Sequence, residues 1–225
     1  MTLRVYDTRS RSKRIFTPLE EGKIGIYACG ITPYSPSHIG HARQAIAFDI
    51  IVRWLRKSGY DVNYISNFTD IDDKIISVSQ KEEVDFLEVA NRNIEDYFIV
   101  MDKLNVIRAD EYPRVTETIP EIISMIEVLI RKNHAYVCSD GVYFEIDTAP
   151  EKYGLLTGQT LEMVRKGAGG RVGNTGSQKR DHRDFALWKR AKKGEPSWDS
   201  PWGLGRPGWH IECSAMSLKH LGERF

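Results

Sequence analysis

The segment from Tyr27 to His41 reads YACGITPYSPSHIGH. It runs from an apolar, strand-like stretch through a loop with two prolines into two histidines, three residues apart, at an expected helix start. Helix N-termini expose unpaired N–H groups and carry a partial positive charge, so they bind phosphate. The position of the histidines therefore indicates a nucleotide-binding loop, and Cys29, nine residues ahead of His38, is a candidate metal ligand on the same loop.

The sequence on both sides of this segment predicts a strand–helix–strand unit. Residues 23–27 predict a short strand, residues 37–57 a helix capped by Ser37 and ended near Gly59, and residues 60–66 a second, parallel strand. Such a unit, opening on a ligand-like loop, is typical of a nucleotide-binding α/β fold. The loop between this strand and this helix carries neither G-x-G-x-x-G nor a Walker lysine motif, so the dinucleotide and P-loop classes lose their usual support.

The rest of the chain predicts further helices and an inserted lobe. Helical spacing of apolar residues over 85–104 and 119–130 predicts two helices with a core-facing side. Residues 137–146 predict a β-hairpin that opens the inserted lobe. The segment 200–214 is too rich in glycine for a strand, and we expect a shaped loop there, followed by a short helix over 213–221.

Composition limits the class of protein without identifying it. The 225 residues are 41% hydrophobic, and 32 basic residues balance 31 acidic ones, which neither indicates nor excludes a nucleic-acid partner. Three cysteines without a C-x-x-C pair fit a reducing compartment better than a disulfide framework. Because no signal-like or membrane-spanning run is present, we expect a cytoplasmic protein with no membrane partner.

A basic, glycine- and serine-rich stretch covers residues 166–184. Its Lys and Arg side chains could contact an RNA backbone, since such residues supply most phosphate binding. A solvated connector accounts for the same composition, and we favour that interpretation.

His38 and His41 are the first candidates for chemistry. At positions i and i+3 they project from one face of the first helical turn, where imidazoles can donate hydrogen bonds to a phosphate as its charge grows. Singly, either histidine is better explained as a helix cap or a packed surface residue. Residues 67–74 follow the second strand and should face the same crevice. Their three aspartates lack EF-hand spacing, and helix capping accounts for them, so we do not expect them to bind a metal.

Cys29 and Cys213 are candidate ligands of a zinc ion. Their spacing alone does not make a motif, and two structural thiols are the default interpretation. Cys138 is expected to be a small packing residue. The zinc hypothesis requires that the two thiols meet at one crevice, beside the imidazoles of His38 and His41.

Four segments together resemble cysteinyl-tRNA synthetases, which are class I aminoacyl-tRNA synthetases. They are YACGIT with HIGH (27–32 and 38–41), NFTDIDDKII (67–76), DFALWK (184–189) and SPWGLGRPGWHIECS (200–214). The resemblance covers essentially the whole chain. It implies a Rossmann-like α/β nucleotide-binding domain with an inserted α+β connective lobe, truncated before its second half is complete. The implied boundaries are 1–115 for the first half, 116–199 for the insertion and 200–225 for the start of the second half.

The resemblance also implies a reaction. A cysteine–tRNA ligase joins cysteine to ATP, with Mg²⁺, to give cysteinyl-adenylate, and then transfers the cysteinyl group to tRNA(Cys). By this resemblance His38 and His41 steady the phosphate, with Gly40 between them in the nucleotide site, and Cys29 and Cys213 are two ligands of a Zn²⁺ that holds the substrate thiolate. The positions that match the aminoacyl pocket are Gly30, Thr32, Thr69 and Trp209.

The chain departs from the family pattern at its end. In the family, the remaining His and Glu zinc ligands, the KMSKS loop, later strands and the anticodon-binding region follow the point reached at Phe225. We therefore expect an N-terminal part of a catalytic core, inactive alone in aminoacylation, with His210 packed rather than drafted as a zinc ligand. Two alternatives are a mycothiol-pathway ligase that joins cysteine to an amino-sugar, and a truncated paralogue that binds cysteine or nucleotide without turnover.

Overall fold

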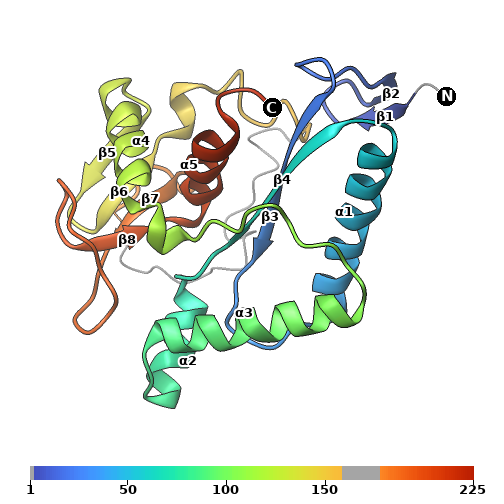
Figure 1. The fold of residues 1–225 in the computed structure, drawn as a ribbon. Helices are drawn as coiled ribbons and strands as arrows, with labels where there is room; N and C mark the ends of the chain where they lie inside the picture. Colours follow the sequence, from blue (N-terminus) through green and yellow to red (C-terminus); the bar gives the residue numbers. More distant parts are fainter. Residues whose placement is uncertain (1–2, 159–177) are drawn as a thin grey trace. The chain divides into compact units, whose positions relative to one another are not determined.

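The computed structural model describes residues 3–158 and 178–225 and has a mixed α/β fold (Figure 1). Its contacts divide the chain into two compact units, each described by itself below. The first unit comprises 1–17, 123–192 and 197–210, and the second comprises 18–122, 193–196 and 211–225. Most of the basic stretch at 166–184 lies outside the described residues.

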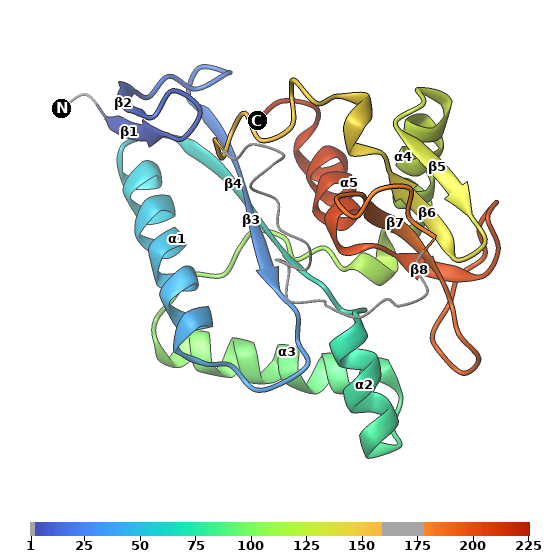
Figure 2. The same cartoon turned by 180° about the vertical axis from the view of Figure 1, so that it is seen from behind.

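The second unit is built on two parallel strands joined by a helix. Strand β3 (Lys23–Ile31) pairs in parallel with β4 (Asp61–Phe68), and α1 (Ile39–Lys57) connects them, as Figure 2 shows. The predicted strand–helix–strand unit is confirmed. The first strand is longer than predicted, because it continues through a bulge between Ala28 and Ile31.

The start of α1 differs from the prediction by one residue. His38, not Ser37, is the N-cap: its backbone is extended, and its side chain accepts a hydrogen bond from the N–H of Gly40. The backbone N–H of Ser37 instead donates to the carboxylate of Asp96 at 2.8 Å, which holds the loop ahead of the helix. The helix ends as expected just before Gly59, whose φ of +93° suits glycine.

Two further helices and an extended segment also belong to this unit. Helices α2 (Asp73–Glu82) and α3 (Phe86–Lys103) follow β4, and the predicted helix over 85–104 is confirmed. The segment 110–114 runs along the other edge of β4, where its carbonyl groups accept hydrogen bonds from backbone N–H groups of that strand. The core is aromatic around Phe68, whose ring contacts those of three neighbours: Tyr97, Phe98 and Tyr112.

The first unit contains a four-stranded antiparallel sheet. Its strands, in spatial order, are β5 (Ala135–Cys138), β6 (Gly141–Phe144), β7 (Phe185–Arg190) and β8 (Gly205–Pro207). The predicted hairpin is β5–β6 and is confirmed.

The expectation of a loop without strand over 200–214 is wrong, because β8 lies within it. Glycine at this point is a packing requirement and not a breaker. A Cβ atom on Gly205 would lie 2.3 Å from the indole nitrogen of Trp188 on the paired strand. Only a residue without a side chain lets these two strands pair here.

Helix α4 (Ile119–Arg131) matches the predicted helix over 119–130. Helix α5 (Trp209–Leu221) ends as predicted but begins four residues earlier than the expected Cys213. The first unit also holds a short exposed hairpin of β1 (Arg4–Asp7) and β2 (Ser12–Ile15). No helix within 3–158 or 178–225 is long and apolar enough to cross a membrane.

The two units do not follow the boundaries expected from the sequence. Strand β8 and the N-terminal hairpin group with the residues of the expected insertion, 116–199. The boundaries 1–115, 116–199 and 200–225 describe halves of a larger domain and stay a prediction.

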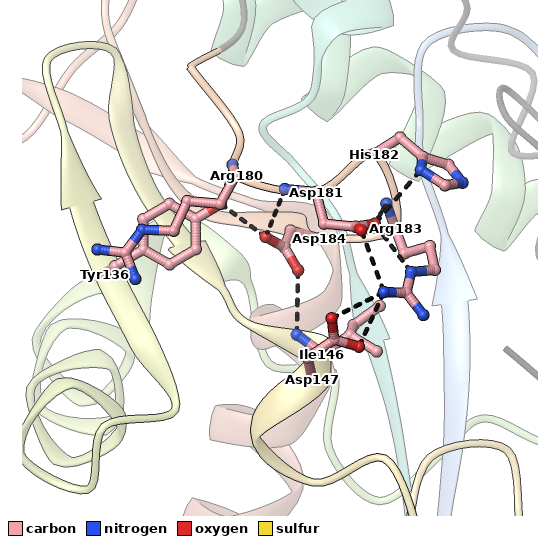
Figure 3. Close-up of polar contacts among 8 residues, drawn as sticks. All are labelled: Tyr136, Ile146, Asp147, Arg180, Asp181, His182, Arg183 and Asp184. Carbon is pink, nitrogen blue, oxygen red and sulfur yellow. Dashed lines mark hydrogen bonds and ion pairs between the residues drawn. The ribbon is translucent and has the colours of Figure 1, made fainter.

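A buried carboxylate organises the first unit (Figure 3). Asp184 is 2% exposed and accepts hydrogen bonds from the hydroxyl of Tyr136 at 2.7 Å and from the backbone N–H groups of Ile146 at 3.0 Å and Asp181 at 3.2 Å. These three hydrogen bonds to one buried carboxylate hold the segment that leads into β7 against the β5–β6 hairpin.

Two of the basic residues considered for RNA contact lie in the same region. Arg180 contacts Glu145 at 3.2 Å and lies over the ring of Tyr136, and Arg183 pairs with Asp147 at 2.8 Å. Both guanidinium groups therefore have carboxylate partners within the unit.

Candidate functional site

Cys29 and Cys213 meet in the second unit. Cys29 lies on β3 close to its carboxyl end, Cys213 lies on α5, and their Sγ atoms are 3.3 Å apart. Cys29 is exposed and Cys213 is partly buried. The expectation that these two thiols meet, although 184 residues separate them, is confirmed.

The two thiols differ in pKa. The 3.3 Å contact with the Cys213 thiol lowers the pKa of Cys29 to about 7. The same contact, together with burial, raises the pKa of Cys213. As the pH rises through about 7, a thiolate therefore forms on Cys29 before Cys213 ionises, and a thiolate is the form that binds soft metals.

Asn67 joins the parts of this site, although we expected no role for its side chain from the sequence. Its side chain, 1% exposed at the end of β4, accepts hydrogen bonds through Oδ1 from the N–H of Gly30 at 3.0 Å and the hydroxyl of Tyr27 at 3.1 Å. The Sγ atom of Cys213 lies 3.7 Å from the same oxygen. The register of the sheet was the available signal, because Ala28 pairs with the residue just before Asn67.

Gly30 is fixed by contact with the neighbouring strand. A Cβ atom on this residue would lie 1.6 Å from the backbone oxygen of Asn67. The bulge in β3 brings the two backbones this close, and only glycine allows it.

The two histidines form a reciprocal cap at the start of α1. The Nδ1 atom of His38 accepts from the N–H of Gly40 at 3.0 Å, and the Nδ1 atom of His41 accepts from the N–H of His38 at 3.4 Å. An accepting Nδ1 assigns the proton of a neutral imidazole to Nε2. Burial, and secondarily the neighbouring His38, lower the pKa of His41, which favours this neutral form.

Both rings therefore present an Nε2–H donor at a helix N-terminus. The rings are stacked, with centroids 3.8 Å apart and planes inclined by 21°. Two parallel donors at the positive end of a helix suit the oxygens of a phosphate group.

The histidine helix and the cysteine strand are directly connected. The side-chain amide of Gln44, on α1, donates to the backbone oxygen of Cys29 at 2.6 Å. Gly30 and His41 line one small cavity of about 10 Å³, with room for about one water molecule. The thiols and the imidazoles thus belong to adjacent parts of one unit.

The remaining candidate residues fall in two places. In the second unit, Thr69 is buried, its N–H donates to the carbonyl of Ile31 at 3.0 Å, and its hydroxyl lies 3.4 Å from the Nδ2 atom of Asn67. Thr32 is half-buried on the loop that follows β3. Trp209 belongs to the first unit and is 50% exposed.

His210, which we expected to be packed in a loop, is instead exposed and lies in α5. Its ring contacts Phe185 with centroids 4.8 Å apart and also lies beside Trp209.

The aspartates that follow β4 have structural partners. Asp72 is the N-cap of α2 and accepts from the N–H of Lys74 at 3.0 Å. Asp70 is fully buried and accepts from both the N–H and the hydroxyl of Thr116, and burial raises its pKa. In the part of the chain that the structure describes, no group of three or more His, Cys, Asp or Glu side chains is arranged to hold a metal ion.

Comparisons with known proteins assign the chain to a family. Residues 15–225 match the family model of the tRNA synthetases class I (C) catalytic domain. Among curated proteins, the chain is 52% identical over 220 residues to a cysteine–tRNA ligase of Maridesulfovibrio salexigens, covering 97% of this chain and 44% of that protein. It is 51% identical over 224 residues to the cysteine–tRNA ligase of Shewanella sediminis, covering 99% and 48%.

The chain thus spans about half the length of the curated relatives it matches. Among solved structures, it is similar to Mycobacterium tuberculosis methionyl-tRNA synthetase in complex with methionyl-adenylate, with a TM-score of 0.61 and 14% identity. That match covers 88% of this chain and 47% of the synthetase. At this identity the likeness concerns the fold, and it agrees with the Rossmann-like core expected from the sequence.

Proposed function

The chain belongs to the family of class I (C) tRNA synthetase catalytic domains, and on this premise we propose that it supplies the amino-acid-binding and phosphate-binding half of a cysteine–tRNA ligase. The reaction would activate cysteine with ATP and Mg²⁺ to cysteinyl-adenylate and then transfer the cysteinyl group to tRNA(Cys). The 3.3 Å contact between the Sγ atoms of Cys29 and Cys213 is the observation that carries this proposal.

The thiol pair fits a zinc ion in both chemistry and spacing. Zinc binds thiolates at about 2.3 Å in tetrahedral sites, so two sulfur ligands lie about 3.8 Å apart. The observed distance of 3.3 Å needs only a small widening to admit the ion. Cys29 and Cys213 would hold it, with further ligands from outside the described residues, and the bound ion would supply a soft Lewis acid for the substrate sulfur.

Such a site addresses the main selectivity problem of the reaction. Serine differs from cysteine by one atom, and pocket shape discriminates such small differences by only about 1–3 kcal/mol. A thiolate ligand at zinc is a bond that a serine hydroxyl does not match at neutral pH. Selection can therefore be made at the sulfur without a separate editing domain.

The histidine pair serves the phosphate side of the same reaction. When the cysteine carboxylate attacks the α-phosphorus of ATP, negative charge grows on the phosphate oxygens before pyrophosphate leaves. The Nε2–H groups assigned to His38 and His41 would donate to those oxygens, aided by the partial positive charge at the start of α1. Gly40 leaves room for the His38 ring over the helix start, because a Cβ at residue 40 would lie 2.8 Å from His38 Cε1.

The aminoacyl pocket remains assigned by resemblance. Gly30 and Thr69 are both connected to Asn67, and Thr32 lies on the loop between β3 and α1, which is consistent with a common pocket. Trp209 is proposed as its aromatic wall. A cytoplasmic location follows from the reaction and belongs to the same proposal.

The test compares the activity of the 225-residue chain alone with that of a full-length chimera. The 225-residue chain alone is expected to show no cysteine-dependent ATP–pyrophosphate exchange, because its curated relatives carry about as much sequence again. A chimera that continues this chain with the second half of the Shewanella sediminis relative should exchange with cysteine and not with serine. Cys29→Ser in that chimera should abolish the preference for cysteine.

The acceptor distinguishes the alternatives. Transfer of cysteine to tRNA by the chimera supports the ligase assigned here, whereas transfer to an amino-sugar supports the mycothiol-pathway reaction. A folded chimera that binds cysteine and ATP without exchange would favour the non-catalytic alternative. The relatives reported above favour the tRNA ligase.

A further inference from the structure

We propose that Asn67 is the positioning residue of the cysteine site, and that its side-chain oxygen sets the distance between the Cys29 and Cys213 thiols. The hydroxyl of Tyr27 fixes the orientation of the Asn67 side chain. This inference rests on the proposed function for its biological meaning, but its geometry stands on its own. Asn67 lies at the end of β4, and its Oδ1 atom contacts both the backbone N–H that follows Cys29 and the Sγ atom of Cys213.

The first step is the contact with β3. Oδ1 of Asn67 accepts from the N–H of Gly30 at 3.0 Å, directly after Cys29 in the chain. This bond holds the bulge that turns the strand at the cysteine. Because Asn67 is 1% exposed, losing its side chain would leave the partly buried N–H of Gly30 without its acceptor.

The second step is the contact with α5. The Sγ atom of Cys213 lies 3.7 Å from the same Oδ1 atom, within reach of a long sulfur hydrogen bond. One oxygen therefore contacts the helix that carries Cys213 and the residue next to Cys29. A shift of this oxygen changes the distance between the two sulfurs, which is the quantity that a two-thiolate ligand set must hold.

The third step is the role of Tyr27. Its hydroxyl donates to Oδ1 of Asn67 at 3.1 Å, and the same hydroxyl interacts with the thiol of Cys213. The phenol thus fixes the orientation of the amide, so that Oδ1 rather than Nδ2 faces Gly30.

The experiment measures the distance-dependent coupling of the two thiols in the 225-residue chain, without cysteine, ATP or tRNA. In a Cys138→Ser background with chelator present, equimolar diamide oxidises Cys29 and Cys213 to a disulfide and is itself reduced to the hydrazine. We expect Asn67→Ala to slow this intramolecular step by at least tenfold and Tyr27→Phe by about threefold. Cadmium–thiolate absorption on addition of Cd²⁺ should weaken in the same order.

The matched control is Asn93→Ala. Asn93 is also a buried amide of the second unit, 4% exposed, but it donates to the carbonyls of Pro33 and Val89 and contacts neither thiol. Its loss should lower stability comparably while leaving the oxidation rate within twofold of the parent. A rate change in Asn93→Ala equal to that in Asn67→Ala would overturn the proposal, because it would reflect general loosening.

The other outcomes also decide. A folded Asn67→Ala chain with parental oxidation rate and cadmium absorption overturns the proposal. If circular dichroism shows that Asn67→Ala does not fold, Tyr27→Phe and Asn67→Ser carry the test by the same criterion. A parent chain that couples its thiols through Asn67 but gives no exchange in the chimera would contradict the proposed function and leave the positioning role intact.

Discussion

The imidazoles of His38 and His41 stack with their centroids 3.8 Å apart. The Nδ1 atom of His38 accepts from the N–H of Gly40, and the Nδ1 atom of His41 accepts from the N–H of His38. The same residues therefore cap α1 and present donors to a phosphate. Structural and chemical roles are usually confounded in such a motif, but here they use different nitrogen atoms of each ring. A substitution that keeps one nitrogen function and removes the other can separate them.

His38→Asn and His38→Ala make that separation. Asparagine keeps an N-cap acceptor, so the free energy of unfolding should stay near the parental value, whereas alanine should cost about 1 kcal/mol. Both variants lose the Nε2–H donor, so both should lower adenylate formation in the chimera by roughly 10²–10³-fold. Urea unfolding and pyrophosphate exchange measure the two effects. Full activity in folded His38→Asn would contradict the phosphate role.

Gly30→Ala should be far more damaging than Gly40→Ala. The new Cβ at residue 30 meets the backbone oxygen of Asn67 at 1.6 Å, which cannot move without breaking the β3–β4 pairing. We expect a loss of about 3 kcal/mol or more in the free energy of unfolding. At residue 40 the contact is with the His38 ring, which can turn away, and alanine favours the helix by about 1 kcal/mol.

Urea unfolding followed by circular dichroism compares the two glycine variants directly. Gly40→Ala should stay within about 1 kcal/mol of the parent, since the gain in helix propensity offsets the lost cap. Equal losses in the two variants would show that the bulge at Gly30 is not as tight as described.

The reactivity of Cys29 should rise with pH around neutrality. Its pKa is lowered to about 7 by the contact with the Cys213 thiol, so its thiolate forms as the pH rises through 7. In the metal-free Cys138→Ser chain, the alkylation rate of Cys29 by iodoacetamide should reach half its maximum near pH 7. Cys213→Ala removes this contact and should move the midpoint upward by a unit or more. An unchanged midpoint would argue against the thiol–thiolate contact.

The sequence was sufficient for those parts of the fold that depend on local pattern. The alternation around β4, the glycine after α1 and the spacing of apolar residues in α3 each marked an element whose existence the structure confirms. The convergence of Cys29 and Cys213 came from matching family motifs, because 184 residues separate them and no local rule joins them.

The features that the sequence missed depend on tertiary contacts. Gly205 looked like a strand breaker, but the close approach of Trp188 makes glycine the residue that this strand requires. Asn67 looked like one polar residue in a motif, and its role depends on a register that places it beside Gly30. The helix cap is His38 and not Ser37, because the N–H of Ser37 donates to Asp96 on α3 and holds Ser37 in the loop. Helix propensities describe local preference and do not include such a tertiary contact.

Acidification should destabilise the second unit through His41. Burial lowers its pKa in the folded chain below that of the unfolded chain, so the unfolded state binds the proton first. Stability therefore falls as the pH drops below about 6.5, the ordinary pKa of histidine. Protonation would also remove the acceptor for the His38 N–H. The Tm of His41→Gln should depend less on pH between 7.5 and 5 than that of the parent, and an identical dependence would contradict this assignment.

Asp184 should prove the most sensitive polar residue of the first unit. Asp184→Ala leaves three donors without their acceptor, namely the hydroxyl of Tyr136 and two backbone N–H groups, in a site that is 2% exposed. Unsatisfied buried groups cost about 1–3 kcal/mol each, so we expect a loss of about 3–5 kcal/mol, whereas Tyr136→Phe removes one partner and should cost about 1–2 kcal/mol.

Tryptophan fluorescence is the appropriate probe for the Asp184 variants, because four of the five tryptophans belong to the first unit. Urea transitions followed at this signal should shift to lower denaturant in the order Tyr136→Phe, Asp184→Asn, Asp184→Ala. Asparagine should be intermediate, since it keeps one acceptor oxygen but loses the charge that strengthens all three hydrogen bonds. If Asp184→Ala unfolds at the same urea concentration as Tyr136→Phe, the carboxylate does not organise the approach to β7, and the Tyr136 contact alone accounts for the stability of that loop.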